Sequence, residues 1–340
     1  MNESHGLLDF FGLREQPFAS TADPAYFYAM RDHKSCLFRL WGSIDERHGI
    51  AVVLGNYGTG KTTLLRKLMS GMAADPEKYN TVVLASPIPS WTSFSLLEAI
   101  TERFGLHPAE RTFGAHMEAL NEYLLANRHR ICTLIIDDAQ NLNKRGQLEL
   151  LRLAQNLETP QHKLLNLVFF AQLEWMEVLR AAPNFHQRIN LTYTLSPVSV
   201  DAVDEMIQYR LNLAAVDRSR LPQFDEAAVA MIHAFSEGNP RVIVTLCRNA
   251  LVLAAQLESR HVSGEIVLHT IETTTGADPS KLQQLRGLAP APARIEPVPV
   301  AQAAVGTEST VVPLHAVGRG RAYENRANQL LAQAARTKQR

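Results

Sequence analysis

Residues 55–62 read Gly55-Asn56-Tyr57-Gly58-Thr59-Gly60-Lys61-Thr62. We expect the rest of the chain to be organised around this stretch. They fill every position of G-x-x-x-x-G-K-[ST], after a short apolar run at 51–54 and before a helix-like segment at 63–69. The glycines let the backbone curl so that successive N–H groups face phosphate oxygens, and the following helix adds its positive dipole end. A glycine-rich turn that merely precedes a helix is the alternative. The strand, the lysine and the hydroxyl together favour a phosphate-binding loop.

This loop predicts a site for ATP and Mg²⁺. Lys61 is expected to reach the β and γ phosphates, so it counts as both a binding and a catalytic residue. Thr62 is expected to place its hydroxyl on Mg²⁺. The residues expected to contact the nucleotide at this loop are Gly55, Asn56, Tyr57, Gly58, Thr59, Gly60, Lys61, Thr62 and Thr63.

A second motif follows at 132–140, where an apolar run ends in two carboxylates, Asp137 and Asp138. The end of such a strand lies beside a phosphate-binding loop at the carboxyl edge of a parallel sheet. Asp137 is expected to hold Mg²⁺ through its water shell, and Asp138 to orient or deprotonate the attacking water. The pattern is weak alone. It becomes strong because Asp137 follows Thr62 by 137 − 62 = 75 residues.

Short β-rich runs alternate with helical ones up to residue 198, which predicts an α/β fold with a parallel sheet covered by helices on both faces. The expected strands are 51–54, 81–85, 131–136, 165–171 and 191–195. The expected helices of this part are 31–46, 63–69, 94–104, 113–127, 148–158 and 173–182. Helical patterns at 203–214, 225–235, 240–257 and 262–273 predict a small all-helical lid domain.

The predicted domains are 1–198 with an N-terminal cap, the lid at 199–276, a proline- and alanine-rich linker at 277–318, and a flexible basic tail at 319–340. The aromatic segment of this cap, residues 10–18, is expected either to close over an adenine ring or to pack under the sheet. Six basic residues against one glutamate give the tail 6 − 1 = +5. The tail is equally consistent with a docking peptide and with a solvated end. Within it, residues 325–336 are expected to form a short helix.

Composition narrows the class of protein. The chain has 340 residues, 46% of them hydrophobic, and a net formal charge of zero, so any nucleic-acid surface must be a local patch. Cys36, Cys132 and Cys247 form no C-x-x-C pair, which argues against a disulfide framework or a zinc site. No apolar run approaches the roughly 18 to 20 residues that span a bilayer, and no signal pattern begins the chain. We therefore expect a cytoplasmic protein.

Several motifs together resemble the ExeA/GspA-type AAA+ ATPases, a group close to the TnsC/TniB-type transposition ATPases. The resemblance runs from about Leu8 to Thr275. It implies the AAA+ P-loop NTPase fold and an ATP-driven homo-oligomer, ring or filament, with nucleotide between neighbouring subunits. The residues that carry it are Phe11-Gly12-Leu13, Pro17-Phe18, Asp23-Pro24, the run 135–142, Gln187-Arg188-Ile189 and Gly238-Asn239-Pro240-Arg241.

The resemblance also implies roles for individual residues. Gln172 falls at the position of the polar sensor 1 residue, and Arg241 at the sensor 2 position of the lid. Arg188 falls where an arginine finger that acts on the neighbouring subunit is expected, with Arg180 as its rival. Asp138 stands where members of the family usually carry Glu, which predicts slow hydrolysis. Leu173 stands where they usually carry Pro.

Three functions are consistent with these features. The main expectation is a transposition target-selection regulator that assembles on duplex DNA and contacts a transposase or target-selector protein. The alternative is a cytoplasmic ATPase of a secretion or envelope-export system, and a third is a nucleotide-switched scaffold with little catalysis. The segment 86–105, which often faces DNA in related ATPases, contains no lysine, so direct support for a phosphate-binding groove is thin.

Overall fold

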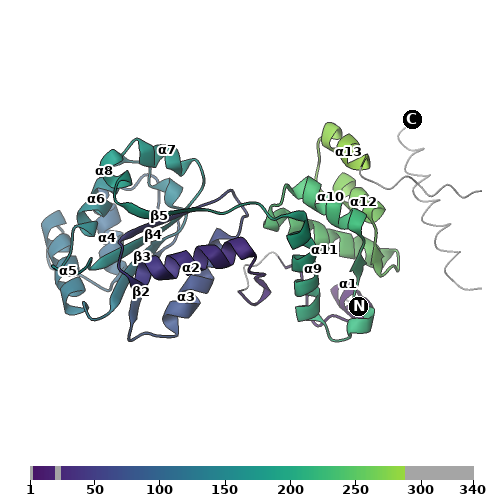
Figure 1. Cartoon of the computed structure of the whole chain (residues 1–340), viewed down its shortest axis with the longest axis horizontal. Coiled ribbons are helices and arrows are strands. Elements are labelled where there is room, and N and C mark those ends of the chain that lie inside the picture. The colour runs from purple at the N-terminus through teal and green to yellow at the C-terminus, as the bar shows by residue number, and fades with distance from the viewer. Residues whose placement is uncertain (1–2, 20–23, 288–340) are drawn as a thin grey trace, which may run out of the picture. The chain divides into compact units, whose positions relative to one another are not determined.

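The computed structural model describes residues 3–19 and 24–287, which divide into two compact units (Figure 1). One, which we call the sheet unit, comprises Arg14–Ala215 and Ile232–Arg248. The other, the helical unit, comprises the described residues 3–13, 216–231 and 249–287. The sheet unit takes in helix α9 (Val200–Ala214), which the sequence had placed in the lid domain. The domain boundaries drawn from the sequence stay a prediction.

The sheet unit is built on five parallel strands in the order β2-β3-β4-β1-β5. All five coincide with strands expected from the sequence, to within about two residues at either end. Because every pair is parallel, the carboxyl ends of all five strands lie at the same edge of the sheet, where ligands bind in this class of fold. The strands are β1 (Ile50–Leu54), β2 (Tyr79–Leu84), β3 (Ile131–Ile136), β4 (Leu165–Ala171) and β5 (Ile189–Thr194).

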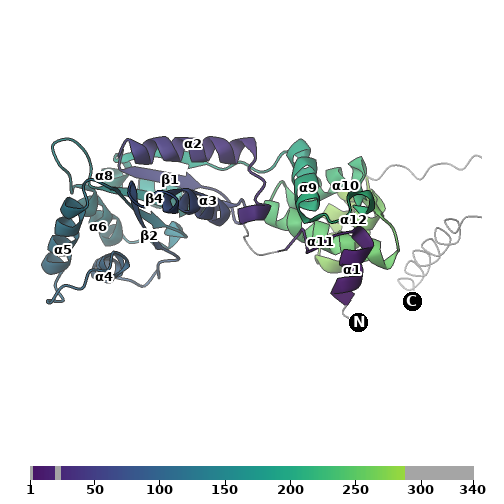
Figure 2. The same cartoon turned by 90° about the horizontal axis from the view of Figure 1, so that it is seen from below.

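Helices cover both faces of this sheet, as the alternating pattern predicted (Figures 1 and 2). Successive strand residues point to opposite faces, so Ala51 and Val53 pack on one side and Val52 and Leu54 on the other. The first side is covered by α2 (Arg31–Asp45) and α3 (Lys61–Ala73). The second is covered by α4 (Ser93–Arg103), α5 (Phe113–Ala126), α6 (Arg145–Gln155), α7 (Trp175–Arg180) and α8 (Pro183–His186).

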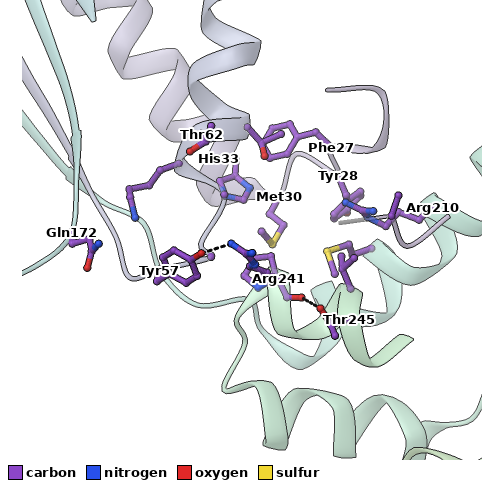
Figure 3. A pocket seen from close by; sticks show the side chains of 18 of the residues that line it. Phe27, Tyr28, Met30, His33, Tyr57, Thr62, Gln172, Arg210, Arg241 and Thr245 are labelled. Carbon is purple, nitrogen blue, oxygen red and sulfur yellow. Dashed lines mark hydrogen bonds between the residues drawn. The ribbon is translucent and has the colours of Figure 1, made fainter. Parts of the chain in front are cut away.

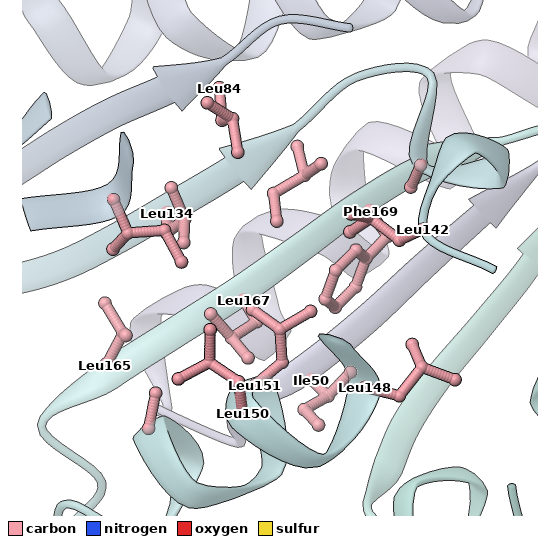
Figure 4. Packing of buried hydrophobic residues seen from close by; sticks show 14 of the residues in the cluster. Ile50, Leu84, Leu134, Leu142, Leu148, Leu150, Leu151, Leu165, Leu167 and Phe169 are labelled. Carbon is pink, nitrogen blue, oxygen red and sulfur yellow. The ribbon is translucent and has the colours of Figure 1, made fainter. Parts of the chain in front are cut away.

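The core on the second side shows why the central strands are mostly apolar. Leu134, Leu167 and Phe169 contribute from β3 and β4, while α6 inserts Leu148 and Leu151 against them (Figure 4). These side chains are 0 to 2% exposed, and each buried aliphatic side chain contributes about 1.5–3 kcal/mol to stability. The packed strands therefore hold the loops at their carboxyl ends in fixed positions.

Two expected helices have different bounds in the structure. The helix expected at 148–158 begins at Arg145, because Gln147 accepts a 3.0 Å hydrogen bond from the Lys144 backbone N–H at its start. It ends at Gln155, and Glu158 pairs instead with Lys163 in an isolated antiparallel bridge.

The helix expected at 173–182 is two short helices, α7 and α8. Ala182 precedes Pro183 and is not helical, with φ −121° and ψ 68°. A residue before proline is pushed out of the helical region by the proline ring, which explains the break.

The helical unit contains elements that sequence patterns missed. These are α1 (Glu3–Phe11) and the two-residue parallel strands β6 (Gln223–Phe224) and β7 (His261–Val262), beside the expected α12 (Gly264–Thr274). The guanidinium of Arg260 lies 5.3 Å from the centre of the Phe10 ring and so attaches α1 to this unit. Helices α10 (Glu226–Ser236) and α11 (Pro240–Gln256) each contribute residues to both units.

Part of the expected linker is helical. Residues 279–286 form α13 (Pro279–Arg286), whose first turn is capped by Asp278 through a 2.7 Å bond from the Ser280 N–H. Leu285 is buried, which the composition of this segment did not suggest. Residues 288–318 of the expected linker, the basic tail 319–340 and its expected short helix at 325–336 lie outside the described residues.

The structure also bears on the cysteines and on membrane-spanning helices. Cys36, Cys132 and Cys247 are all buried, and each is a free cysteine in the described part of the chain. Among the residues that the structure describes, no helix combines the length and apolar character needed to cross a bilayer.

Candidate nucleotide-binding site

The loop 55–60 joins the end of β1 to the start of α3 and has the backbone that its glycines predict. Gly58 and Gly60 have φ values of 81° and 93°, a region that side chains disfavour. A Cβ on Gly58 would lie 2.3 Å from Oδ1 of Asn239, so glycine is needed there for space as well. Gly60 is the N-cap of α3, whose first residue is Lys61. The loop therefore directs backbone N–H groups and a helix N-terminus to one point.

Lys61 turns its ammonium back into this loop. Its Nζ donates to the carbonyl oxygens of Gly55 at 2.8 Å and Asn56 at 3.0 Å, and the residue is only 8% exposed. Burial lowers the pKa of Lys61, while the negative charges of Asp137 and Asp138 oppose that shift. The lysine is thus a partly desolvated cation held at the mouth of the anion-binding loop.

The two expected Mg²⁺ residues meet in space. The Thr62 hydroxyl donates a 3.1 Å hydrogen bond to Oδ2 of Asp137. Burial raises the pKa of Asp137, and the N–H of Asp138, which donates to Oδ1 at 3.0 Å, opposes the rise. A hydroxyl and a carboxylate are the hard oxygen ligands that Mg²⁺ prefers, and this ion usually completes its shell with waters and phosphates. A Mg²⁺ site of this kind therefore needs few protein ligands. Among residues 3–19 and 24–287, no group of three or more His, Cys, Asp or Glu side chains is arranged to hold a metal ion.

Asp138 is the second residue after β3 and has a left-handed backbone, with φ 51° and ψ 40°. Its Oδ2 accepts a 2.7 Å hydrogen bond from the Ser86 hydroxyl, and its Oδ1 accepts a 3.1 Å bond from Nε2 of Gln140. Asp138 and Gln172 both line the pocket in front of the loop. The motif at 132–140 indicated Asp138 and the family resemblance implied Gln172, but neither indicated Ser86 or the contact of Gln140.

The pocket itself has a volume of about 260 Å³, just below the usual range for small-molecule sites (Figure 3). Of the expected nucleotide contacts, Tyr57, Gly58, Gly60, Lys61, Thr62, Thr63 and Arg241 line it. The other expected contacts, Gly55, Asn56, Thr59 and Asp137, are not among the residues that line it. The lining residues that sequence reasoning missed are Ala19, Phe27, Tyr28, Met30, His33, Met206, Arg210, Pro240, Val244 and Thr245.

The cap segment contributes to this pocket with residues other than those expected. Phe27, Tyr28 and Met30 line it, whereas Phe18 is fully buried in the interior. The aromatic run Tyr26-Phe27-Tyr28 just before α2 is the signal that could have located this wall.

His33 lies under the loop, on the first turns of α2. Its Nε2 lies 3.1 Å from the carbonyl oxygen of Thr59, so that nitrogen carries the proton and donates. Its Nδ1 is buried without a hydrogen-bond partner in the described part of the chain, and burial lowers the pKa of His33. The imidazole therefore supports the loop in its neutral form.

Arg241 approaches the loop from the start of α11. Its guanidinium lies 4.9 Å from the centre of the Tyr57 ring, and its Nη1 donates to the Tyr57 hydroxyl (Figure 3). Asn239 donates from Nδ2 to the Tyr57 carbonyl at 2.6 Å and accepts from the Arg241 N–H at 3.0 Å. The position that the resemblance assigned to sensor 2 is therefore in contact with the phosphate-binding loop.

Arg188, the expected finger, is not among the residues that line the pocket. It follows α8 and donates from Nη1 to Oδ1 of Asn156 at 2.7 Å. Arg180, its rival, is exposed in the last turn of α7. An arginine that acts on a neighbouring subunit would lie away from the pocket of its own subunit. The positions of Arg188 and Arg180 are therefore both consistent with the role of arginine finger.

A parallel sheet with a glycine loop after β1, a lysine at the start of α3 and a carboxylate pair after β3 defines a P-loop NTPase. Residues 44–179 match the family model described as "AAA domain". The chain thus contains an AAA domain, which implies ATP binding.

The resemblance to ExeA/GspA-type AAA+ ATPases, expected from the motifs, is confirmed by the comparison with curated proteins. The chain is 34% identical over 272 residues to General secretion pathway protein A of Aeromonas hydrophila, across 78% of this chain. It spans about half of that relative, 48% of its length.

Solved structures agree on the fold. The Cdc6p protein of Pyrobaculum aerophilum superposes with a TM-score of 0.57 at 19% identity, over 76% of this chain and 73% of that one. The ORC2 protein of Aeropyrum pernix superposes with a TM-score of 0.53 at 13% identity, over 75% of this chain and 70% of that one. These similarities establish the AAA+ architecture of a P-loop sheet with a helical lid.

The comparisons bear on the three functions expected from the sequence. The curated relative is named as a secretion-pathway protein, which favours the export alternative over the main expectation of a transposition regulator. DNA binding and a transposase partner gain no support from this relative.

Proposed function

We propose that this chain binds ATP with Mg²⁺ and hydrolyses it slowly, as the AAA+ ATPase of a secretion or envelope-export system. The observation that carries this proposal is its 34% identity over 272 residues to a secretion-pathway protein, across 78% of this chain. An ATP-using unit of such a system works on the cytoplasmic side, where ATP is available. Neighbouring copies would assemble with nucleotide between them.

The chemistry follows from the placement of the side chains. The N–H groups of the loop and Lys61 bind the β and γ phosphates, and Thr62 and Asp137 would hold Mg²⁺, which neutralises charge on those phosphates. Asp138 orients a water molecule and accepts its proton as the oxygen attacks the γ phosphorus. The bond from that phosphorus to the bridging oxygen breaks, which releases ADP and inorganic phosphate.

Hydrolysis is slow in this proposal because the water-orienting carboxylate is short. Asp138 has one methylene fewer than the glutamate usual in the family. Its carboxylate is also occupied by Ser86 and Gln140 on both oxygens. ATP would then act in large part as an assembly signal, with an arginine from the neighbouring copy, Arg188 or Arg180, completing the site.

A chimera tests the export role. The matching region of the Aeromonas hydrophila relative is replaced by this chain, and secretion is measured in a strain that lacks the native protein. We expect the chimera to restore secretion and the same chimera with Lys61→Ala to fail. Loss of secretion with a well-expressed chimera, together with ATP-dependent assembly of the purified chain on duplex DNA, would instead favour transposition.

A further inference from the structure

The carboxyl ends of β2, β3 and β4 are joined by one chain of hydrogen bonds. The Ser86 hydroxyl, two residues after β2, donates to Oδ2 of Asp138 at 2.7 Å. Gln140, in the short 3-10 turn after β3, donates from Nε2 to Oδ1 of Asp138 at 3.1 Å. The Oε1 of Gln140 accepts a 3.2 Å bond from the backbone N–H of Gln172, the residue after β4. One amide side chain thus links a carboxylate on one strand end to the backbone of the next.

The side-chain amide of Gln140 makes one hydrogen bond through its NH₂ group and one through its oxygen, and the two partners fix which group faces which. The Asp138 carboxylate can only accept, and the Gln172 N–H can only donate, so the amide must present its NH₂ to one and its oxygen to the other. Ionised glutamate at this position would lack the donor and would set two negative charges side by side. Alanine at this position could make neither hydrogen bond, so Asp138 would lose a donor and the Gln172 N–H would lose an acceptor. Among these three residue types, only glutamine satisfies both contacts.

Two residues of this chain of hydrogen bonds also have an unusual backbone conformation. Asp138 and Ser86 have φ values of 51° and 48°, in the left-handed region that such residues seldom occupy. Conformations of this kind persist when surrounding contacts over-determine them, and they gather at active sites. Gln140 is half-buried and does not line the pocket, whereas Asp138 and Gln172 do. Gln140 is therefore placed to act through these two residues and not on the nucleotide itself.

We propose that Gln140 is a positioning residue that fixes the direction of the Asp138 carboxylate and ties it to the backbone at Gln172. The end of β4 and the water-orienting carboxylate then move together. A change at Gln172 would therefore alter the angle at which Asp138 holds its water. This inference rests on the proposed ATPase function.

The test compares Gln140→Ala and Gln140→Glu with Asn141→Ala, a change in the adjacent, equally half-buried residue of the same turn. We expect both Gln140 variants to lower kcat by about tenfold or more, the scale of a misdirected general base. The Kd for ATP should stay within about twofold, because Gln140 does not line the pocket. Asn141→Ala should match the wild type in both quantities.

A pH profile separates positioning from a general loss of structure. When the new carboxyl in Gln140→Glu is protonated, it regains a donor for Asp138, and neighbouring carboxylates raise the pKa of one member of the pair. The ratio of kcat in Gln140→Glu to kcat in the wild type should therefore rise as the pH falls from about 8 to about 6. In Gln140→Ala the ratio should stay flat.

A crystal structure of Gln140→Ala gives a readout that needs no hydrolysis. We expect the Asp138 carboxylate to turn away from its position beside Ser86. An unmoved carboxylate, or a wild-type kcat in both Gln140 variants, would overturn the inference. A wild-type protein that binds ATP without hydrolysing it would refute the proposed ATPase instead, and the crystal structure would still decide the role of Gln140.

Discussion

The hydroxyl of Thr62 lies 3.1 Å from Oδ2 of Asp137, across 75 residues of sequence. Thr62 is at the start of α3, just after β1, and Asp137 is just after β3. These strands are not neighbours, because β4 lies between them in the sheet. The contact is possible because parallel strands bring their carboxyl ends to one edge, so a loop after β1 can reach a side chain two strands away.

Lys61→Ala should weaken ATP binding by at least about tenfold without unfolding the protein, since the ammonium is the main positive charge at the β and γ phosphates. Binding of a fluorescent ATP analogue measures the affinity, and thermal unfolding checks the fold. Lys67→Ala is the matched control, because Lys67 is an exposed lysine of the same helix. Equal affinities in the wild type and Lys61→Ala would remove the basis of the assigned site.

Asp138→Asn should keep ATP binding and lose hydrolysis by about 10²-fold, the usual contribution of a general base. An asparagine can still accept from Gln140 through Oδ1 and can donate to the Ser86 hydroxyl through Nδ2, so the local geometry survives. ATP-dependent oligomers should persist or last longer. Phosphate release and gel filtration with ATP measure the two effects, and undiminished phosphate release in this variant would rule out Asp138 as the base.

Arg188→Ala should bind ATP normally and lose ATP-dependent assembly and hydrolysis, if Arg188 completes the site of a neighbouring subunit. A missing arginine finger costs about 10³-fold where the residue has this role. Mixing Arg188→Ala with Lys61→Ala should restore part of the activity, because some interfaces then combine an intact loop with an intact arginine. Arg180→Ala serves as the comparison, and a fully active Arg188→Ala would transfer the role to Arg180.

The stability of the fold should fall as the pH drops below about 6.5, in part because of His33. Burial lowers the pKa of His33 in the folded protein, whereas an unfolded histidine titrates near about 6.5. Between the lowered folded value and about 6.5, the unfolded chain binds more protons, so the free energy of unfolding decreases with falling pH. Urea unfolding at about pH 7.5 and about pH 5.5 measures this slope.

The variant His33→Gln tests that assignment. Glutamine can still donate to the Thr59 carbonyl but does not titrate, so it should remove part of the pH slope. His129→Gln, a change in an exposed histidine, is the control. If both variants keep the full slope, groups other than His33 carry the pH dependence.

Local patterns in the sequence determined the elements of the sheet unit. The run Ile131–Ile136 is apolar at every position but Thr133, because a central parallel strand is covered on both faces, and such a run is visible without coordinates. The glycines of the loop were equally visible, since glycine is the residue type that permits the positive φ values found at Gly58 and Gly60. The ends of helices were harder to predict. The start of α6 depends on a hydrogen bond to Gln147, and Glu158 after its end pairs with Lys163, and neither contact is reflected in the hydrophobic periodicity.

The walls of the pocket and the hydrogen bonds around Asp138 were decided by the tertiary structure alone. His33 meets Thr59 across 26 residues, and Asn239 meets Tyr57 across 182. The bond between Gln140 and Gln172 requires β3 and β4 to be neighbours, which the sequence pattern does not specify. Backbone conformation and burial periodicity are properties of consecutive residues, so a single sequence carries them. A contact between distant residues depends on strand order and helix packing, and it exists only once the whole chain has folded.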